Sequence, residues 1–101
     1  MGVHADFNAN DKIVTLRISG VFDFQMHREF RDAYTRDAGE RPRYTVDLRG
    51  TTYIDSSALG MLLLLREHVG GDRAKIRIIN APQEIRQILM IANFHRLFDI
   101  A

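Results

Sequence analysis

Apolar and polar residues alternate near the start of the chain, and this alternation predicts two strands. Residues 3–7 form a short candidate strand, and a polar turn follows at residues 8–11. Residues 13–19 then alternate largely apolar and polar side chains up to Gly20, as a strand with one buried face does. Because only a short polar segment separates the two strands, we expect them to form a hairpin.

Three later segments carry apolar residues three and four positions apart, which predicts helices. The first helix follows Asp23, a candidate N-cap, and is expected to end at residues 39–42. The second begins at Asp55 or Ser56, after a turn at residues 51–52. The third has Pro82 in its first turn. The expected buried positions are Met26, Phe30, Ala33, Tyr34 and Ala38 in the first helix, and Ile85, Ile88, Leu89 and Ala92 in the last.

Two more apolar segments, residues 44–48 and 75–79, lie between these helices and read as strands. Strands separated by helices pair in parallel through right-handed crossovers. The order β, β, α, β, α, β, α therefore predicts an α/β fold: a mixed sheet of four to five strands with three or so helices packed against it. The apolar tail, residues 94–100, is expected to pack as an edge segment.

Composition places the chain among small globular domains. Its 101 residues, 46% of them hydrophobic, suit a single domain, 1–101, that buries a core without a metal. There is no cysteine, which excludes disulfides and thiolate chemistry and agrees with a reducing cytoplasm. The longest uninterrupted apolar run, residues 61–65, is far shorter than the ~20 residues that span a bilayer. We expect a cytoplasmic protein without direct membrane insertion.

Charge and histidine placement argue against nucleic-acid binding and against catalysis. Lys and Arg number 14 and Asp and Glu 13, and the signs alternate, so no one-signed basic stripe is present for nucleic acid. The four histidines are scattered without metal-ligand spacing. Neither a Gly-Lys-Ser/Thr phosphate loop nor a Gly-x-Ser-x-Gly elbow occurs. The sequence therefore predicts no enzyme, no metal and no cofactor.

The junction before the second helix carries the most informative chemistry. Asp55 is suited to cap the helix, and Ser56 and Ser57 follow at its first turn. The N–H groups there lack intrahelical partners and the macrodipole is positive, so a phosphate on serine would be stabilised locally. Capping is the commoner role of such residues, and both readings stay open from these residues alone.

The second helix carries apolar side chains beyond its expected core stripe. Ala58, Leu62, Leu65 and Val69 share one side of the helix, whereas Gly60 and Leu63 share another with Ser56. Met61 and Leu64 widen the apolar surface further, and it either packs on a neighbouring element or meets a partner.

The loops that follow the parallel strands define where a recognition site would lie. These loops, residues 20–24, 49–56 and 80–82, emerge at one edge of such a sheet, where open α/β folds place their sites. We therefore expect Asp23 and Ser56 to be spatial neighbours.

With these elements in place, the chain resembles the STAS domain family, specifically the stand-alone bacterial anti-sigma factor antagonists. The resemblance rests on Asp55-Ser56-Ser57-Ala58-Leu59-Gly60 after Val46-Asp47-Leu48, on Gly20-Val21-Phe22-Asp23, and on Ile91-Ala92-Asn93-Phe94 with Leu97-Phe98. One departure is Ala58, where the commoner motif has glycine. It leaves the fold intact but places the fit of a kinase in question.

The resemblance implies a partner switch. The unphosphorylated antagonist binds an anti-sigma factor, or its serine kinase, and frees a sigma factor; phosphorylation ends the binding, and a phosphatase restores the free serine. Ser56 matches the family phosphoacceptor, Ser57 a neighbouring contact and Asp23 an acidic residue at the recognition edge. The partner surface then comprises Asp23, Asp55, Ser56, Ser57, Gly60, Met61, Leu63 and Leu64.

Two alternatives remain. One is a cytoplasmic STAS subunit of an ABC-type lipid transporter, which also keeps a hydroxyl after the aspartate. The other is a module that binds a small ligand at the same edge, for which no residue argues. The identity of the co-purifying ATPase separates the first from the switch.

Overall fold

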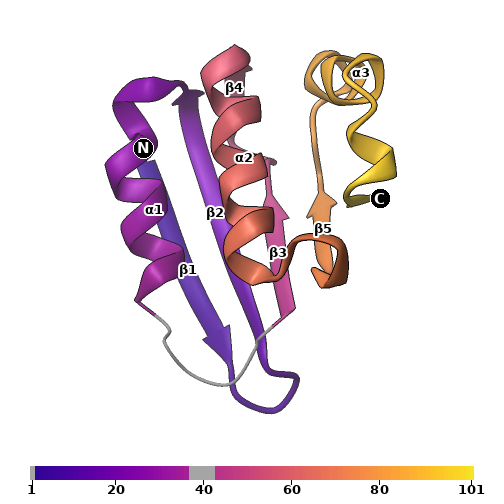
Figure 1. Cartoon of the computed structure of the whole chain (residues 1–101). Coiled ribbons are helices and arrows are strands. Elements are labelled where there is room, and N and C mark those ends of the chain that lie inside the picture. Colours follow the sequence, from indigo (N-terminus) through magenta and orange to yellow (C-terminus); the bar gives the residue numbers. More distant parts are fainter. Residues whose placement is uncertain (1, 37–42) are drawn as a thin grey trace.

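The computed structural model describes residues 2–36 and 43–101, and it shows a mixed sheet with helices over one face (Figure 1). Within these residues six strands form the sheet: β1 (Gly2–Asn8), β2 (Ile13–Phe22), β3 (Arg43–Asp47), β4 (Thr51–Ile54), β5 (Ile76–Ile79) and β6 (Asp99–Ile100). Their order is β1-β2-β3-β5-β6, and β4 pairs with β2. The expected α/β fold is confirmed, with two strands, β4 and the short β6, that the pattern did not predict.

The expected hairpin is confirmed, because β1 and β2 pair antiparallel over their lengths. All other pairings are parallel. Along the edge opposite β1, β2 is long enough to pair with two strands. Its residues 13–17 pair with β3, and its last part, which contains a bulge at Gly20/Val21, pairs with β4.

The segment expected as a turn at Thr51-Thr52 is the start of β4, so that prediction is wrong. Besides the pairing with β2, two hydrogen bonds anchor the start of this strand: the buried Thr51 hydroxyl donates to the Ile18 carbonyl at 2.7 Å, and the Gly20 N–H donates to the Gly50 carbonyl at 2.9 Å. A Cβ on Gly50 would stand 2.8 Å from Ser19 Oγ, so the turn needs glycine for this close approach. β4 forms because the last part of β2 extends past its pairing with β3 and pairs with β4 instead. The local sequence pattern of residues 51–54 does not indicate this distant pairing.

In the part of the chain that the structure describes, three α-helices connect the strands: α1 (His27–Thr35), α2 (Ser56–Val69) and α3 (Gln83–Ile91). Short 3-10 helices precede α1 at Phe24–Met26, follow α2 at Gly71–Arg73 and follow α3 at Phe94–Arg96. Helices α1 and α2 lie side by side over the sheet, and α3 lies beyond the carboxyl end of β5 (Figure 1). Ala38 and the expected helix end at 39–42 fall outside the described residues. No described helix has both the length and the apolar character needed to cross a bilayer.

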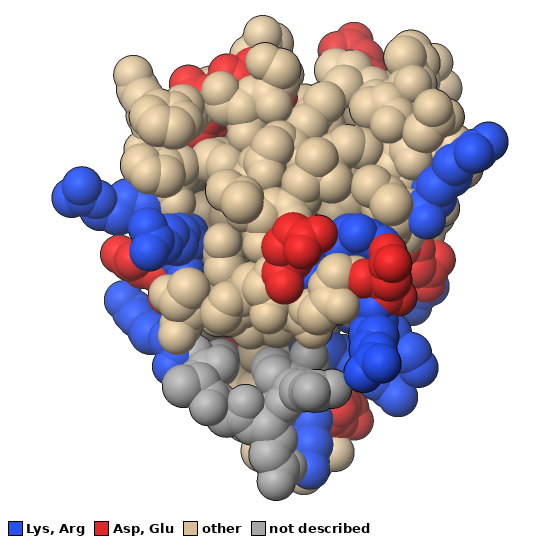
Figure 2. All heavy atoms as spheres, in the orientation of Figure 1, with Lys and Arg blue, Asp and Glu red and all other residues tan. Residues whose placement is uncertain are grey.

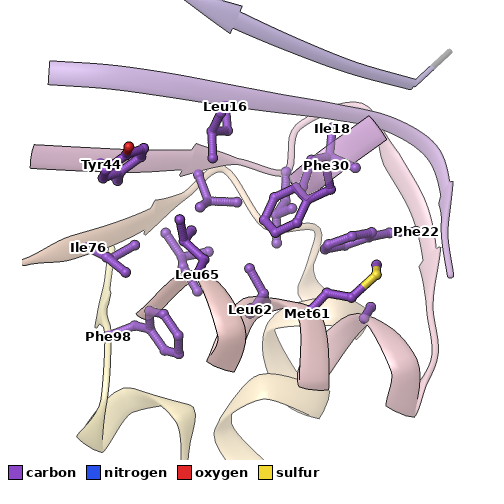
Figure 3. Packing of buried hydrophobic residues seen from close by; sticks show 14 of the residues in the cluster. Leu16, Ile18, Phe22, Phe30, Tyr44, Met61, Leu62, Leu65, Ile76 and Phe98 are labelled. Carbon is purple, nitrogen blue, oxygen red and sulfur yellow. The ribbon is translucent and has the colours of Figure 1, made fainter. Parts of the chain in front are cut away.

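The core fills the space between the sheet and α1 and α2 (Figure 3). Leu16 and Ile18 from β2 point toward Phe22, Phe30 and the α2 side chains, and each of these residues is buried. On the opposite face of β2, Arg17 is exposed, whereas Thr15 and Ser19 are half-buried, and the helices of the described residues lie over the face that carries Leu16 and Ile18.

The last helix buries a narrower apolar stripe than expected. Ile85 and Leu89 are buried, but Ile88 is 38% exposed and Ala92, which lies just past the last turn of α3, is also exposed. The prediction that all four positions are buried is therefore wrong for these two. The tail is confirmed as an edge segment, since Phe94 and Phe98 are buried and β6 ends the sheet beside β5.

Candidate functional site

The candidate site lies where β2 and β4 end together. Phe22 and Ile54 are register partners in this parallel pair, and Asp23 and Asp55 are the residues that follow them. The two carboxylates thus leave adjacent strand ends on the same edge of the sheet. This arrangement brings Asp23 close to the start of α2, as expected from the sequence.

Both aspartates cap the helical turns that they precede. Asp23 Oδ1 accepts a hydrogen bond from the Gln25 N–H at 3.0 Å, and Asp55 Oδ1 accepts one from the Ala58 N–H at 3.0 Å. Each aspartate has an extended backbone, as N-cap residues do. The capping role of Asp55 is therefore confirmed, and its carboxylate is fixed in place by the helix that it starts.

The two serines differ in their access to solvent. Ser56 is the first residue of α2 and is exposed, whereas Ser57 is half-buried. The N–H groups of this first turn point outward along the helix axis, where the macrodipole is positive. An anion on the Ser56 hydroxyl would therefore sit in solvent beside a favourable helix end.

Helix α2 divides into a core face and an exposed face. Leu64 is 62% exposed, Leu63 is also exposed, and a Cβ on Gly60 would meet no atom within 4 Å. Met61, by contrast, is only 6% exposed. Met61 lies three residues after Ala58 and four before Leu65, so it shares their face, and the prediction that it belongs to the partner surface is wrong.

Three exposed apolar side chains that the sequence reasoning missed flank the aspartates, and we call them the apolar rim: Val21, Phe24 and Tyr53. Val21 and Tyr53 are register partners of β2 and β4, and Tyr53 is 56% exposed. Phe24 stacks on His27 with ring centroids 4.5 Å apart. Val21 and Tyr53 are brought together by the pairing of β2 with β4, and the sequence pattern did not predict β4.

A shallow pocket of about 470 Å³ opens beside Asp23. Its lining includes the carboxylates of Asp23 and Glu29 and the side chains of Ser19, Val21, Gln25 and Met26. Figure 2 shows the arginines and lysines of this face at its two sides and lower part, whereas the upper part is mostly uncharged. The edge therefore combines apolar side chains with carboxylates.

Comparison with known proteins places this arrangement in a family. The family model described as "Mlab, STAS domain" matches residues 5–99. The chain belongs to the STAS domain family. A STAS-domain containing protein of Pseudomonas aeruginosa (strain UCBPP-PA14) is 52% identical over 101 residues, which cover 100% of each chain.

Two solved structures share the fold of this STAS domain. A proposed anti-sigma factor antagonist from Thermotoga maritima matches with a TM-score of 0.82 at 15% identity, over 97% of this chain and 84% of that one. The anti-sigma factor antagonist SpoIIAA in its unphosphorylated form matches with a TM-score of 0.72 at 14% identity, over 99% of this chain and 87% of that one. At these identities the likeness shows the fold.

Proposed function

We propose that this STAS domain is an anti-sigma factor antagonist in a cytoplasmic partner-switching module. Its unphosphorylated form binds an anti-sigma factor or the associated serine kinase and frees a sigma factor; phosphorylation of Ser56 ends the binding. The observation that carries this proposal is the position of Ser56, an exposed hydroxyl at the first residue of α2, beside the strand end that bears Asp23. Two anti-sigma factor antagonists of the same fold support it.

The proposed partner surface runs from the strand ends down the exposed side of α2. It comprises Asp23, Asp55, Ser56, Ser57, Gly60, Leu63 and Leu64, together with the apolar rim. Leucines and aromatic side chains supply the area that a partner would remove from water. The open space over Gly60 allows a partner to approach the helix backbone closely.

The proposed covalent step needs no catalytic group from this chain. The Ser56 oxygen takes the γ-phosphoryl group from ATP held by the kinase, and ADP and a proton leave. A phosphatase returns the hydroxyl by adding water and releasing inorganic phosphate. Exposure of Ser56 allows both enzymes to reach it.

The phosphate would act as a switch through local electrostatics. It adds a charge of about −1.5 to −2 near the carboxylates of Asp23 and Asp55, while the first turn of α2 stabilises it. The domain therefore keeps its fold. Burying this charge against an apolar partner surface carries a desolvation cost, and a loss of ~4 kcal/mol weakens binding about a thousandfold.

The experiment uses the two adjacent serines as a matched pair. The purified chain is incubated with ATP and cell extract, and its intact mass and phosphopeptides are measured for the wild type, Ser56→Ala and Ser57→Ala. We expect one phosphate on the wild type and on Ser57→Ala, and none on Ser56→Ala. A phosphate that persists in Ser56→Ala and disappears in Ser57→Ala would contradict the assignment.

The transporter alternative predicts that a different ATPase binds this chain. Family membership alone fits both functions, so affinity capture of the tagged chain from its native cells distinguishes them. Recovery of a histidine-kinase-like ATPase or a small anti-sigma protein supports the switch. Recovery of a transporter ATPase with a phosphate loop, with no phosphate on Ser56 under any growth condition, supports the transporter subunit.

A further inference from the structure

Within residues 2–36 and 43–101, which the structure describes, no strand lies along the outer edge of β1. Among the described strands, β1 stands at the end of the sheet order and pairs with β2 alone (Figure 1). Alternate residues of an antiparallel strand direct their N–H and C=O groups to opposite sides. Val3 N–H donates to Glu29 Oε2 at 2.9 Å, and the carbonyl of Ile18, the register partner of Val3, accepts from Thr51 instead. Val3, Ala5 and Phe7 therefore direct their backbone groups away from β2.

An exposed row of such groups is a template for another strand. Helix α1 covers part of one face of β1, and Glu29 occupies only the first outward N–H. Ala5 and Phe7 are both exposed, Phe7 to 55%. The remaining outward groups are those of Ala5 and Phe7 and the Val3 carbonyl.

The strand is complementary to itself when two copies run antiparallel about Ala5. Val3 then faces Phe7 of the other copy, which pairs apolar side chains on the side of the sheet that carries the helices. His4 faces Asp6 of the other copy on the open side, and each of these pairs occurs twice. Arg17 donates a hydrogen bond to Asp6 and holds the pKa of that carboxyl below its usual value, so Asp6 is charged at neutral pH.

The register follows from the same residues. Outward-directed residues must face one another, so an alternative register slides one strand by two positions. One such slide places Asp6 opposite Asp6, and like charges directly opposite each other destabilise a sheet. The other places His4 opposite His4 and so loses both pairings of His4 with Asp6. Both slides also leave strand ends unpaired. Pairing about Ala5 uses all seven residues of β1 and opposes unlike side chains.

We propose that β1 binds a second copy of this chain, antiparallel about Ala5, so that two sheets join into one. The Ala5 pair exchanges two hydrogen bonds, and each Phe7 N–H donates to the Val3 carbonyl of the other copy. Each Val3 N–H exchanges Glu29 Oε2 for the Phe7 carbonyl of the other copy. Asp23 and Ser56 lie outside β1, so each copy keeps its candidate site free. The inference is thus independent of the proposed function.

The test is sedimentation analysis of the full chain over a wide concentration range. We expect the mass to rise from 11.6 kDa to about twice that value. Ala5→Pro removes an outward N–H without breaking the β1–β2 ladder and is expected to abolish the dimer, whereas Ala5→Val is the matched control that keeps it. His4→Asp opposes two carboxylates at each pair and is expected to weaken association about tenfold.

Hydrogen exchange locates the contact. The Ala5 and Phe7 amides are expected to exchange more slowly as the dimer forms, and thermal unfolding checks that each variant is folded. If Ala5→Pro does not fold, the test rests on the dimer affinity of His4→Asp, a substitution at an exposed position. A wild-type chain that stays monomeric at every concentration would overturn the proposal. A dimer whose affinity is the same in the wild type, in His4→Asp and in a folded Ala5→Pro would also overturn it, because another surface would then form the dimer.

Discussion

At the scale of single residues, the structure assigns Ala58 to the core rather than to the surface around Ser56. The sequence placed this residue inside the phosphorylation motif, where its methyl group raised a question about kinase fit. In the fold Ala58 is fully buried on the core face of α2, whereas Ser56 points to solvent. The methyl group therefore belongs to the core packing. Under the proposed function, a kinase that approaches Ser56 does not meet it.

Ala58→Gly tests this interpretation. The substitution removes a buried methyl group and adds backbone freedom within a helix, so we expect the free energy of unfolding to fall by about 1–2 kcal/mol. Urea denaturation measures this change. The rate of Ser56 phosphorylation by the kinase is expected to stay the same, and a large change in that rate at unchanged stability would contradict the assignment of Ala58 to the core.

Gly60→Ala is the matched substitution on the exposed side of the same helix. The added Cβ meets no atom within 4 Å, so better helix propensity should raise stability by up to about 1 kcal/mol. Under the proposed function, affinity for the partner falls, because the methyl group fills the space through which the partner approaches. Titration of the two proteins checks this, and an unchanged affinity would remove Gly60 from the partner surface.

At the scale of elements, the sequence predicted what local pattern encodes and missed what depends on a distant neighbour. The hairpin, the three helices and the tail follow from periodicity and caps, and the position of Asp55 from its capping chemistry. β4 has four residues and no alternation, and it exists because the last part of β2 pairs with it. Tyr53 and Val21 of the apolar rim could not be predicted without that register.

Thr51→Val tests the attachment of β4. The substitution keeps the shape of the side chain but removes the hydroxyl that donates to the Ile18 carbonyl at 2.7 Å. The carbonyl loses a buried partner, which costs about 1–3 kcal/mol. Thr52→Val, at the neighbouring exposed position, is the control and should have little effect. Equal losses of stability in the two variants would show that the hydrogen bond does not anchor the strand.

Substitutions on the buried face of α2 are expected to lower stability, whereas substitutions on its exposed face are expected to lower affinity for the proposed partner. Met61→Ala leaves a cavity in the core and should lower stability by about 2–5 kcal/mol. Leu64→Ala truncates an exposed side chain, so its stability should change by less than about 0.5 kcal/mol, while affinity for the partner decreases. Thermal unfolding and a binding titration of both variants give the comparison. Full affinity in Leu64→Ala would exclude this face from the partner surface.

At the scale of the whole molecule, the sheet separates two surfaces with different chemistry. The helices bury one face, and the carboxyl ends of β2 and β4 gather the two capping aspartates, Ser56 and the apolar rim at one edge. The other face carries charged side chains, such as Arg17 and Arg77 with their aspartate partners. A partner that depends on the phosphorylation state of Ser56 should therefore contact the edge and the exposed side of α2.

The most direct test of the proposed switch is the affinity of the proposed anti-sigma partner for this chain, measured by calorimetric titration before and after stoichiometric phosphorylation at Ser56. We predict tight binding of the unphosphorylated chain and of Ser56→Ala, and a loss of about a thousandfold for the phosphorylated chain. Circular dichroism should show the same fold in both states. Equal affinities of the phosphorylated and unphosphorylated chains would contradict the switch.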